Sequence, residues 1–223
     1  MIELNKNGSV KIKKYILIFI VFISFLISCA VKAEIVGKTA DGFIHRYIAS
    51  NGQEIYFVST EQEALVNIDT DVNFDGYPDL TVITNRGASN FFYEFFLWNG
   101  KEYEYAEYKT DDIVNFYPAY GKYIVSERND GSAGALFKTQ ICIWDGNILK
   151  AVRTMVSEEE TVADLKDSIF ITTTYLDKLH VRLWEENPSL GEAVIIWEKT
   201  YDSFPENQED FCEMQTQLWN GLI

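Results

Sequence analysis

Short runs in which apolar and polar residues alternate dominate the chain after its N-terminal segment. Turn residues such as Asn, Asp and Gly separate these runs, and helical periodicity is scarce. Alternating runs rich in β-branched and aromatic residues are typical of half-buried strands. The predicted strands comprise residues 43–48, 54–58, 80–84, 91–98, 103–108, 123–126, 137–144, 148–153, 168–175, 180–185 and 193–200. The pattern therefore predicts an all-β protein.

Turn pairs mark hairpins and reveal a weak internal repeat. Asn51-Gly52 is a pair favoured in type I′ turns, because both residues tolerate positive φ. Trp98, Trp144 and Trp219 each stand directly before an Asn-Gly or Asp-Gly pair, and the first two are 46 residues apart. This spacing is close to the roughly 40 to 50 residues of a four-stranded propeller blade. We therefore predict a β-propeller of about four to five blades, with a β-sandwich as the alternative.

The N-terminal segment has the form of a secretory signal. Lys11, Lys13 and Lys14 provide a cationic region, and residues 15–29 provide the apolar region that follows it. The apolar run is shorter than the about 20 residues that a membrane span requires, although an uncleaved signal anchor is the alternative. Residues 1–33 are therefore interpreted as a signal peptide, and the folded part is predicted to be exported.

Two cleavage sites compete at the end of this segment. The sequence Leu-Ile-Ser before Cys29 resembles the lipobox of bacterial lipoproteins, in which the cysteine is lipidated and becomes the mature N-terminus. Val31 to Ala33 has the small-residue spacing of ordinary signal peptidase cleavage, which would occur before Glu34. Either site predicts a location in the periplasm or cell envelope, with a lipid anchor in the first case.

The composition indicates one acidic domain. The leader holds five of the 19 basic residues and one of the 34 acidic residues, so residues 34–223 carry 14 basic and 33 acidic residues and a net charge of −19. A chain of this length can form a single domain with a substantial core. A strong negative charge repels nucleic acid and anionic lipid and favours cations or a basic protein partner. We predict one domain over residues 34–223 that binds no nucleic acid.

Two cysteines remain once Cys29 is lipidated or removed. Cys142 and Cys212 show no CxxC spacing and no adjacent histidine, so the sequence does not indicate a zinc or redox site. In an oxidising compartment we expect the two residues to form a disulfide that ties the C-terminal segment to the centre of the chain. Two buried free thiols are the alternative.

Residues 71–79 carry the most distinctive chemistry of the sequence. Asp71, Asn73 and Asp75 place oxygen-bearing side chains at alternate positions, and Gly76 follows to permit a sharp turn. Such oxygens converge on one centre when the backbone wraps around a cation, as in the calcium loop of an EF-hand. Carboxylate, amide and carbonyl oxygens are hard ligands, which favour calcium over zinc or copper. The spacing therefore predicts a calcium site.

The remaining ligands would come from the flanks of this loop. Tyr77 would supply its backbone carbonyl, Asp79 would bind directly or through water, and Asp69 is a further candidate. The loop is not a complete EF-hand, because its twelfth position is Val82 and the residues that follow form a predicted strand. A turn dense in Asx residues that cap their own backbone is the alternative. We expect the ion to have a structural role, holding the start of the strand at residues 80–84.

The same residues carry a family resemblance. The pattern Asp-x-Asn-x-Asp-Gly-x-x-Asp-Leu before a strand resembles the calcium loops of FG-GAP and VCBS-type propeller repeats. Gly87, Asn90, Tyr93 and the string Phe96-Leu97-Trp98 resemble the exported β-propeller proteins that inhibit lysozyme. The best-known members of that family are periplasmic immunity proteins against peptidoglycan-cleaving effectors of a bacteria-killing type IV secretion system. The resemblance, clear over residues 69–98 and fainter to about 154, implies a calcium-stabilised propeller that binds a muramidase.

The residues favour binding over catalysis. His45 and His180 are the only histidines, and neither stands in a nucleophile or zinc motif. We predict an exported calcium-stabilised binding protein and not an enzyme, with a lysozyme-inhibitor or immunity function. Its partner would be a basic peptidoglycan-cleaving enzyme, because opposite charge accelerates encounter. The alternative is a cell-envelope structural or carbohydrate-binding lipoprotein without inhibitory activity.

Overall fold

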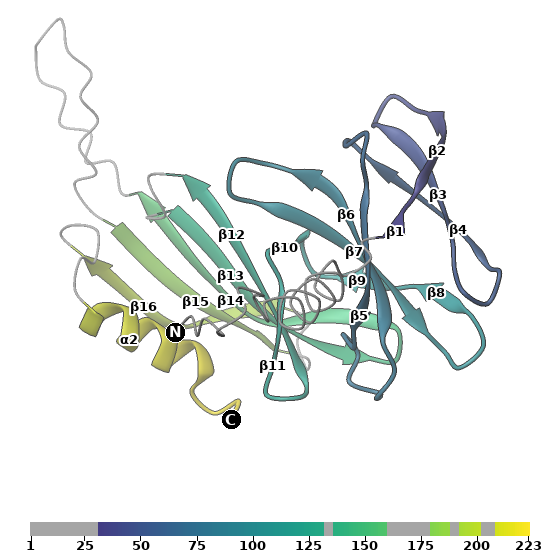
Figure 1. The fold of residues 1–223 in the computed structure, drawn as a ribbon. Coiled ribbons are helices and arrows are strands. Elements are labelled where there is room, and N and C mark those ends of the chain that lie inside the picture. Colours follow the sequence, from purple (N-terminus) through teal and green to yellow (C-terminus); the bar gives the residue numbers. More distant parts are fainter. Residues whose placement is uncertain (1–30, 132–135, 160–178, 188–191, 202–207) are drawn as a thin grey trace, which may run out of the picture.

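The computed structural model describes residues 31–131, 136–159, 179–187, 192–201 and 208–223. These residues form three β-sheets and one helix; the sheets lie side by side, and the helix lies against the outer face of the largest sheet (Figure 1). Residues 1–30 of the predicted signal peptide at 1–33, which include Cys29, lie outside the described residues, and so does the strand predicted at residues 168–175.

The smallest sheet has three strands in the order β2-β3-β4. These strands are β2 at Glu34–Lys38, β3 at Phe43–Ile48 and β4 at Glu54–Ser59. The turn between β3 and β4 contains Asn51 and Gly52, but positive φ occurs only at Gly52, where φ is 85°. The hairpin is therefore confirmed, while its turn is not of the expected type I′, which requires positive φ at both residues.

The next sheet has six strands in the order β1-β5-β6-β7-β10, with β8 also paired to β7. Its strands are β1 at Val31–Lys32, β5 at Leu65–Thr70, β6 at Asp79–Arg86, β7 at Phe91–Trp98, β8 at Tyr103–Tyr105 and β10 at Ile113–Val114. The two residues of β1 pair with Leu65 and Val66 at the edge of the sheet. The first residues after Cys29 and Ala30 in the chain are therefore already part of a sheet.

The largest sheet has seven strands in the order β11-β12-β13-β14-β15-β16. Its strands are β11 at Tyr117–Ala119, β12 at Tyr123–Gly131, β13 at Leu136–Asp145, β14 at Ile148–Glu159, β15 at Leu179–Asn187 and β16 at Glu192–Tyr201. The seventh strand, β9 at Glu107–Lys109, pairs with β14 in parallel, whereas the other pairings are antiparallel. β9 follows β8 of the six-stranded sheet after a single residue, so the chain passes directly from one sheet to the next.

Three hydrophobic cores join these layers. The core between the three- and six-stranded sheets includes Phe57 and Leu80, and the core between the six- and seven-stranded sheets includes Phe95 and Cys142. Successive residues of a strand point to opposite faces, so Ile141, next to Cys142, belongs to the third core. This third core lies between the seven-stranded sheet and the C-terminal helix.

The C-terminal helix α2 spans Gln208–Trp219 and was not expected from the sequence. Its Met214 and Leu218 are buried against the seven-stranded sheet. Its last turn contains no basic residue, but Arg153 of β14 reaches it and donates to the carbonyl oxygens of Leu218 at 2.9 Å and Asn220 at 2.6 Å. A cation at this end satisfies free carbonyl groups and complements the helix dipole.

The all-β prediction is confirmed, with α2 as the exception within the described residues. The predicted propeller of four to five blades is not confirmed, because the described residues form three unequal sheets and no closed ring of strands. Trp98 and Trp144 of the predicted repeat lie at strand ends, but Trp219 ends a helix. The repeat therefore marks chain reversals and does not mark equivalent blades.

Candidate functional site

The loop between β5 and β6 adopts a wrapped conformation. Phe74 has a φ of 63° and Gly76 a φ of 92°, both in the left-handed region. Such values are rare for a bulky residue such as phenylalanine and are readily adopted by glycine. The two residues turn the backbone so that the side chains before them face the N–H groups after them.

Asp71, Asn73 and Asp75 are brought together in this loop. The carboxylate of Asp71 accepts hydrogen bonds from the N–H groups of Asp75 at 3.2 Å and Gly76 at 2.9 Å. The side-chain oxygen of Asn73 accepts from the N–H of Asp75 at 3.1 Å, and its amide nitrogen donates to a carboxylate oxygen of Asp75 at 3.0 Å. The side chains at loop positions 1, 3 and 5 therefore enclose one segment of backbone.

Asp79 has a different environment from these three residues. It is fully buried at the start of β6, and its carboxylate accepts from the backbone N–H groups of Val72 at 2.9 Å, Asn73 at 3.3 Å and Trp98 at 2.8 Å. Burial raises the pKa of Asp79, and the three backbone hydrogen bonds act in the opposite direction. Asp79 thus fastens the loop to its own strand and to the end of β7.

A tryptophan that the sequence did not single out as a site residue also holds the loop. The indole N–H of Trp144, in β13, donates to the carbonyl oxygen of Val72 at 2.6 Å. Val72 itself is fully buried in the core between the six- and seven-stranded sheets. The loop is therefore fixed to both sheets. The sequence signal for this contact is the Trp-Asp-Gly string alone, and that string does not indicate which residue Trp144 contacts.

The donor types in the loop fit a hard divalent cation. Asp71, Asn73 and Asp75 offer two carboxylates and an amide oxygen, and each oxygen keeps capacity beyond the hydrogen bonds already made. The side chain of Tyr77 is 58% exposed and does not pack in the core, so Tyr77 contributes only its backbone to the loop. Among the residues that the structure describes, no group of three or more His, Cys, Asp or Glu side chains is arranged as a metal site. An amide and a carbonyl would therefore have to be among the ligands.

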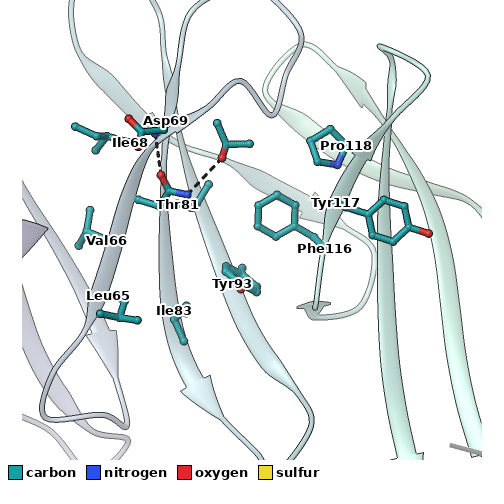
Figure 2. Close-up of a pocket in the computed structure, with 12 residues that line it drawn as sticks. Leu65, Val66, Ile68, Asp69, Thr81, Ile83, Tyr93, Phe116, Tyr117 and Pro118 are labelled. Carbon is teal, nitrogen blue, oxygen red and sulfur yellow. Dashed lines mark hydrogen bonds between the residues drawn. The ribbon is translucent and has the colours of Figure 1, made fainter. Parts of the chain in front are cut away.

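A groove lies beside the loop, over one face of the six-stranded sheet (Figure 2). Its volume is about 500 Å³. It is lined by residues 65–70 of β5, Thr81 and Ile83 of β6, Tyr93 of β7, and Phe116, Tyr117 and Pro118 at the start of β11. Thr70, which lines the groove, directly precedes Asp71, so one end of the groove adjoins the loop.

The remaining candidate residues are not part of this site. The ring of His45 is buried and stacked on Phe57, with centroids 5.4 Å apart, and Nε2 lies 3.0 Å from the carbonyl oxygen of Glu61. His180 lies 3.4 Å from a carboxylate oxygen of Glu198 on the neighbouring strand. The contacts of both histidines lie outside residues 71–79.

The two cysteines are free in the structure, so the expected disulfide is not formed. Cys142 is buried on the face of the seven-stranded sheet that contacts the six-stranded sheet, whereas Cys212 is exposed on α2, which packs on the opposite face. The alternation of side chains along β13 therefore directs Cys142 away from the helix. Burial raises the pKa of the Cys142 thiol to about 12, which makes it unreactive near neutral pH.

No protein-family model matches this chain, and no curated protein matches it in sequence. Among solved structures, a Xanthomonas type IV secretion system related protein matches with a TM-score of 0.45 and 11% sequence identity. The match covers 74% of this chain and 85% of that chain. Within the described residues, no helix is long and apolar enough to cross a membrane.

Proposed function

We propose that the chain is an exported binding protein whose loop at residues 71–79 is stabilised by calcium. The observation that carries the calcium proposal is the convergence of Asp71, Asn73 and Asp75 on one turn of backbone. Two carboxylates this close repel each other, and a cation between them would relieve that repulsion. The bound ion would supply a fixed positive charge and hold the backbone between β5 and β6.

This chain's own residues would divide the work of the site. Asp71, Asn73 and Asp75 would hold the ion through side-chain oxygens, with the carbonyl of Tyr77 as a further ligand. Asp79 would hold the loop from its buried side, where its carboxylate accepts a hydrogen bond from the N–H of Trp98. Because Trp144 also fastens the loop to β13, a loop ordered by the ion would stabilise the contact between the six- and seven-stranded sheets.

The calcium proposal is tested by unfolding the exported chain with calcium and with a chelator. We expect calcium at about 100 times its dissociation constant to stabilise the protein by about 2.7 kcal/mol. The variant Asp75→Ala should lose this gain. Asp41→Ala, which removes an exposed carboxylate from a turn outside the loop, should keep it. An unfolding midpoint of the unaltered chain that ignores both calcium and chelator would refute the proposal.

We further propose that the binding partner is a basic peptidoglycan-cleaving enzyme and that the protein inhibits it. The net charge of −19 over residues 34–223 supports this, since opposite charge steers association. The resemblance of residues 69–98 to exported lysozyme inhibitors supports the same class of partner.

The partner proposal is tested by adding the purified protein to several muramidases and following cell-wall lysis. We expect inhibition of at least one enzyme, together with co-elution of the two proteins at low salt. The association rate should fall as salt is raised, because screening removes the steering. A chain that forms no complex and inhibits none of the enzymes would be better described as a structural protein of the cell envelope.

A further inference from the structure

A second cavity lies beside β7 and has a volume of about 320 Å³, within the range of about 300–1,000 Å³ typical of small-molecule sites. Its lining includes Phe92 and Glu94 of β7, Tyr105 of β8, Tyr108 of β9 and residues 110–113. Tyr105 pairs with Phe96, which stands two residues after Glu94 on β7. Successive residues of a strand point to opposite faces, so Phe92, Glu94 and Tyr105 share one face of the six-stranded sheet.

Aromatic rings form the walls of this cavity and are held in place by their neighbours. The ring of Tyr105 packs edge-on against Phe96, with centroids 5.3 Å apart, and against Tyr108, with centroids 5.9 Å apart. The hydroxyl of Tyr108 accepts a hydrogen bond from the backbone N–H of Phe95 at 2.7 Å. Tyr105 is still 49% exposed, so part of its ring remains open to a ligand. The π-face of such a ring attracts a cation.

Glu94 places a negative charge among these rings. The residue is half-buried, and burial raises its pKa, while a hydrogen bond with the Tyr105 hydroxyl lowers it to a lesser extent. No lysine or arginine of the described residues contributes to this balance, and none of them forms an ion pair with Glu94. A buried charge is costly unless a cation pairs with it. The cavity therefore contains a carboxylate whose counter-ion the described residues do not supply.

The other polar groups of the cavity limit the chemistry of its ligand. Asp112 is exposed, and Asp111 is already paired with Lys138, which lies outside the lining. No lysine or arginine lines the cavity, so an anionic ligand would meet only carboxylates. The described residues include no group of three or more His, Cys, Asp or Glu side chains placed as a metal site, and aromatic rings are not ligands for a hard metal ion. The lining thus favours an organic cation with an apolar part.

We propose that this cavity binds a primary alkylammonium group. The ammonium would donate hydrogen bonds to the carboxylate of Glu94, and its alkyl stem would lie against the rings of Phe92 and Tyr105. A free alkyl diamine and a lysine side chain of another protein both carry this group. The inference goes beyond the proposed function, because it requires neither calcium nor inhibition of an enzyme.

The experiment is an NMR titration of the exported chain at pH 8 with the diamine cadaverine and, separately, with Nα-acetyl-lysine amide. We expect saturable binding of at least one of them to a single site. Glu94→Gln keeps the shape of the side chain but removes its charge, and it should weaken binding about tenfold or more. Tyr105→Leu removes a ring from the wall and should weaken binding about two- to fivefold.

Glu104→Gln is the matched control. It removes an exposed carboxylate from the residue next to Tyr105, on the opposite face of β8, and should leave the affinity unchanged. This control separates binding in the cavity from a general attraction of amines to an acidic protein. The unfolding midpoint of each variant shows that a lost affinity is not a lost fold.

Four outcomes would overturn the proposal. They are an absence of binding to both amines, equally tight binding of the uncharged n-pentanol, an affinity unchanged by Glu94→Gln, and an equal loss of affinity in Glu104→Gln. Tighter binding of cadaverine would identify a free amine as the ligand, and tighter binding of the lysine amide would identify a protein side chain. A protein that ignores calcium or inhibits no muramidase would leave these results unaffected, which separates the proposals.

Discussion

A buried arginine helps to hold the end of the C-terminal helix on the seven-stranded sheet. The side chain of Arg153 is 7% exposed and pairs with Glu185 at 2.7 Å while it donates to carbonyl groups at the end of α2. The sequence could not reveal this role, because the carbonyl partners lie more than 60 residues away along the chain. In β14, Arg153 reads as an ordinary polar position.

Loss of this guanidinium should loosen α2. We expect Arg153→Ala to lower the free energy of unfolding by about 3 kcal/mol, because it leaves helix carbonyls and Glu185 without their partner. Arg182→Ala is the matched control: it removes a more exposed arginine that pairs with Glu158, and it should change stability by less than about 1 kcal/mol. Urea unfolding followed by tryptophan fluorescence measures both, and equal effects would contradict the assignment.

Glu94 provides a test at the same scale that depends on pH. Burial raises the pKa of Glu94, and a hydrogen bond with Tyr105 lowers it to a lesser extent. The folded-state pKa therefore lies above that of the unfolded chain. The stability that Glu94 contributes is fully present below the unfolded pKa and is lost as pH rises through the folded value.

Glu94→Gln, which stays neutral, should thus raise the unfolding midpoint at pH 8 and give no such gain at pH 4. Glu102→Gln, in an exposed turn, is the control and should show no pH-dependent difference. Thermal unfolding at the two pH values tests this. A gain that is equal at both pH values would show that charge burial is not the cause.

At the scale of elements, the alternation of apolar and polar residues was sufficient to predict strands but did not reveal the helix. The strand predicted at 91–98 coincides with β7, because it is rich in aromatic residues, and that at 80–84 lies inside β6, because it is rich in β-branched residues. Helix α2 was missed although Phe211, Met214 and Leu218 have helical spacing. The Trp-Asn-Gly string at its end matches the two earlier copies of the weak repeat, so it indicates a turn pair and not the end of a helix.

The candidate loop was predictable in part, for a reason specific to each residue. Asp71, Asn73 and Asp75 meet through neighbours in sequence, so their spacing was enough to bring them together. The contacts of Asp79 with Trp98 and of Trp144 with Val72 depend on how sheets stack. A pattern with a period of two residues identifies the faces of a strand, but it does not state which face meets which neighbour.

The turn between β2 and β3 requires glycine for a reason that can be tested. Gly42 has a φ of 152°, and a Cβ atom there would lie 2.4 Å from the carbonyl oxygen of Ser59, at the end of β4. We expect Gly42→Ala to destabilise the protein by about 2 kcal/mol or more, because backbone must move. Gly87→Ala, whose new Cβ would meet its nearest atom at 3.6 Å, should change stability by less than about 0.5 kcal/mol. Comparable losses in chemical unfolding would argue against a clash at Gly42.

At the scale of the whole molecule, β1 relates the fold to processing of the chain. Cleavage before Cys29 would keep β1, whereas cleavage after Ala33 would remove it and leave the edge of β5 at Leu65 and Val66 without a partner. Ala33 also packs against the core between the three- and six-stranded sheets. The fold therefore uses residues that ordinary signal peptidase cleavage would discard.

We expect a chain that begins at Glu34 to be less stable than one that begins at Ala30, by about 1–2 kcal/mol, because backbone hydrogen bonds to β5 are lost. Urea unfolding of the two chains measures the difference. A chain from Glu34 with unchanged stability would show that β1 is dispensable, and mass spectrometry of the exported protein would then have to decide the cleavage site.

The short β1 strand also sets a mechanical limit on the anchored form. With lipid on Cys29, only Ala30 separates the anchor from Val31, the first residue of β1. An extended residue spans at most about 3.6 Å, so the strand would begin within about 7 Å of the anchored residue. A linker of that length does not allow the domain to move away from the bilayer. The folded domain would stay next to the membrane surface, so it would bind only partners that reach that surface.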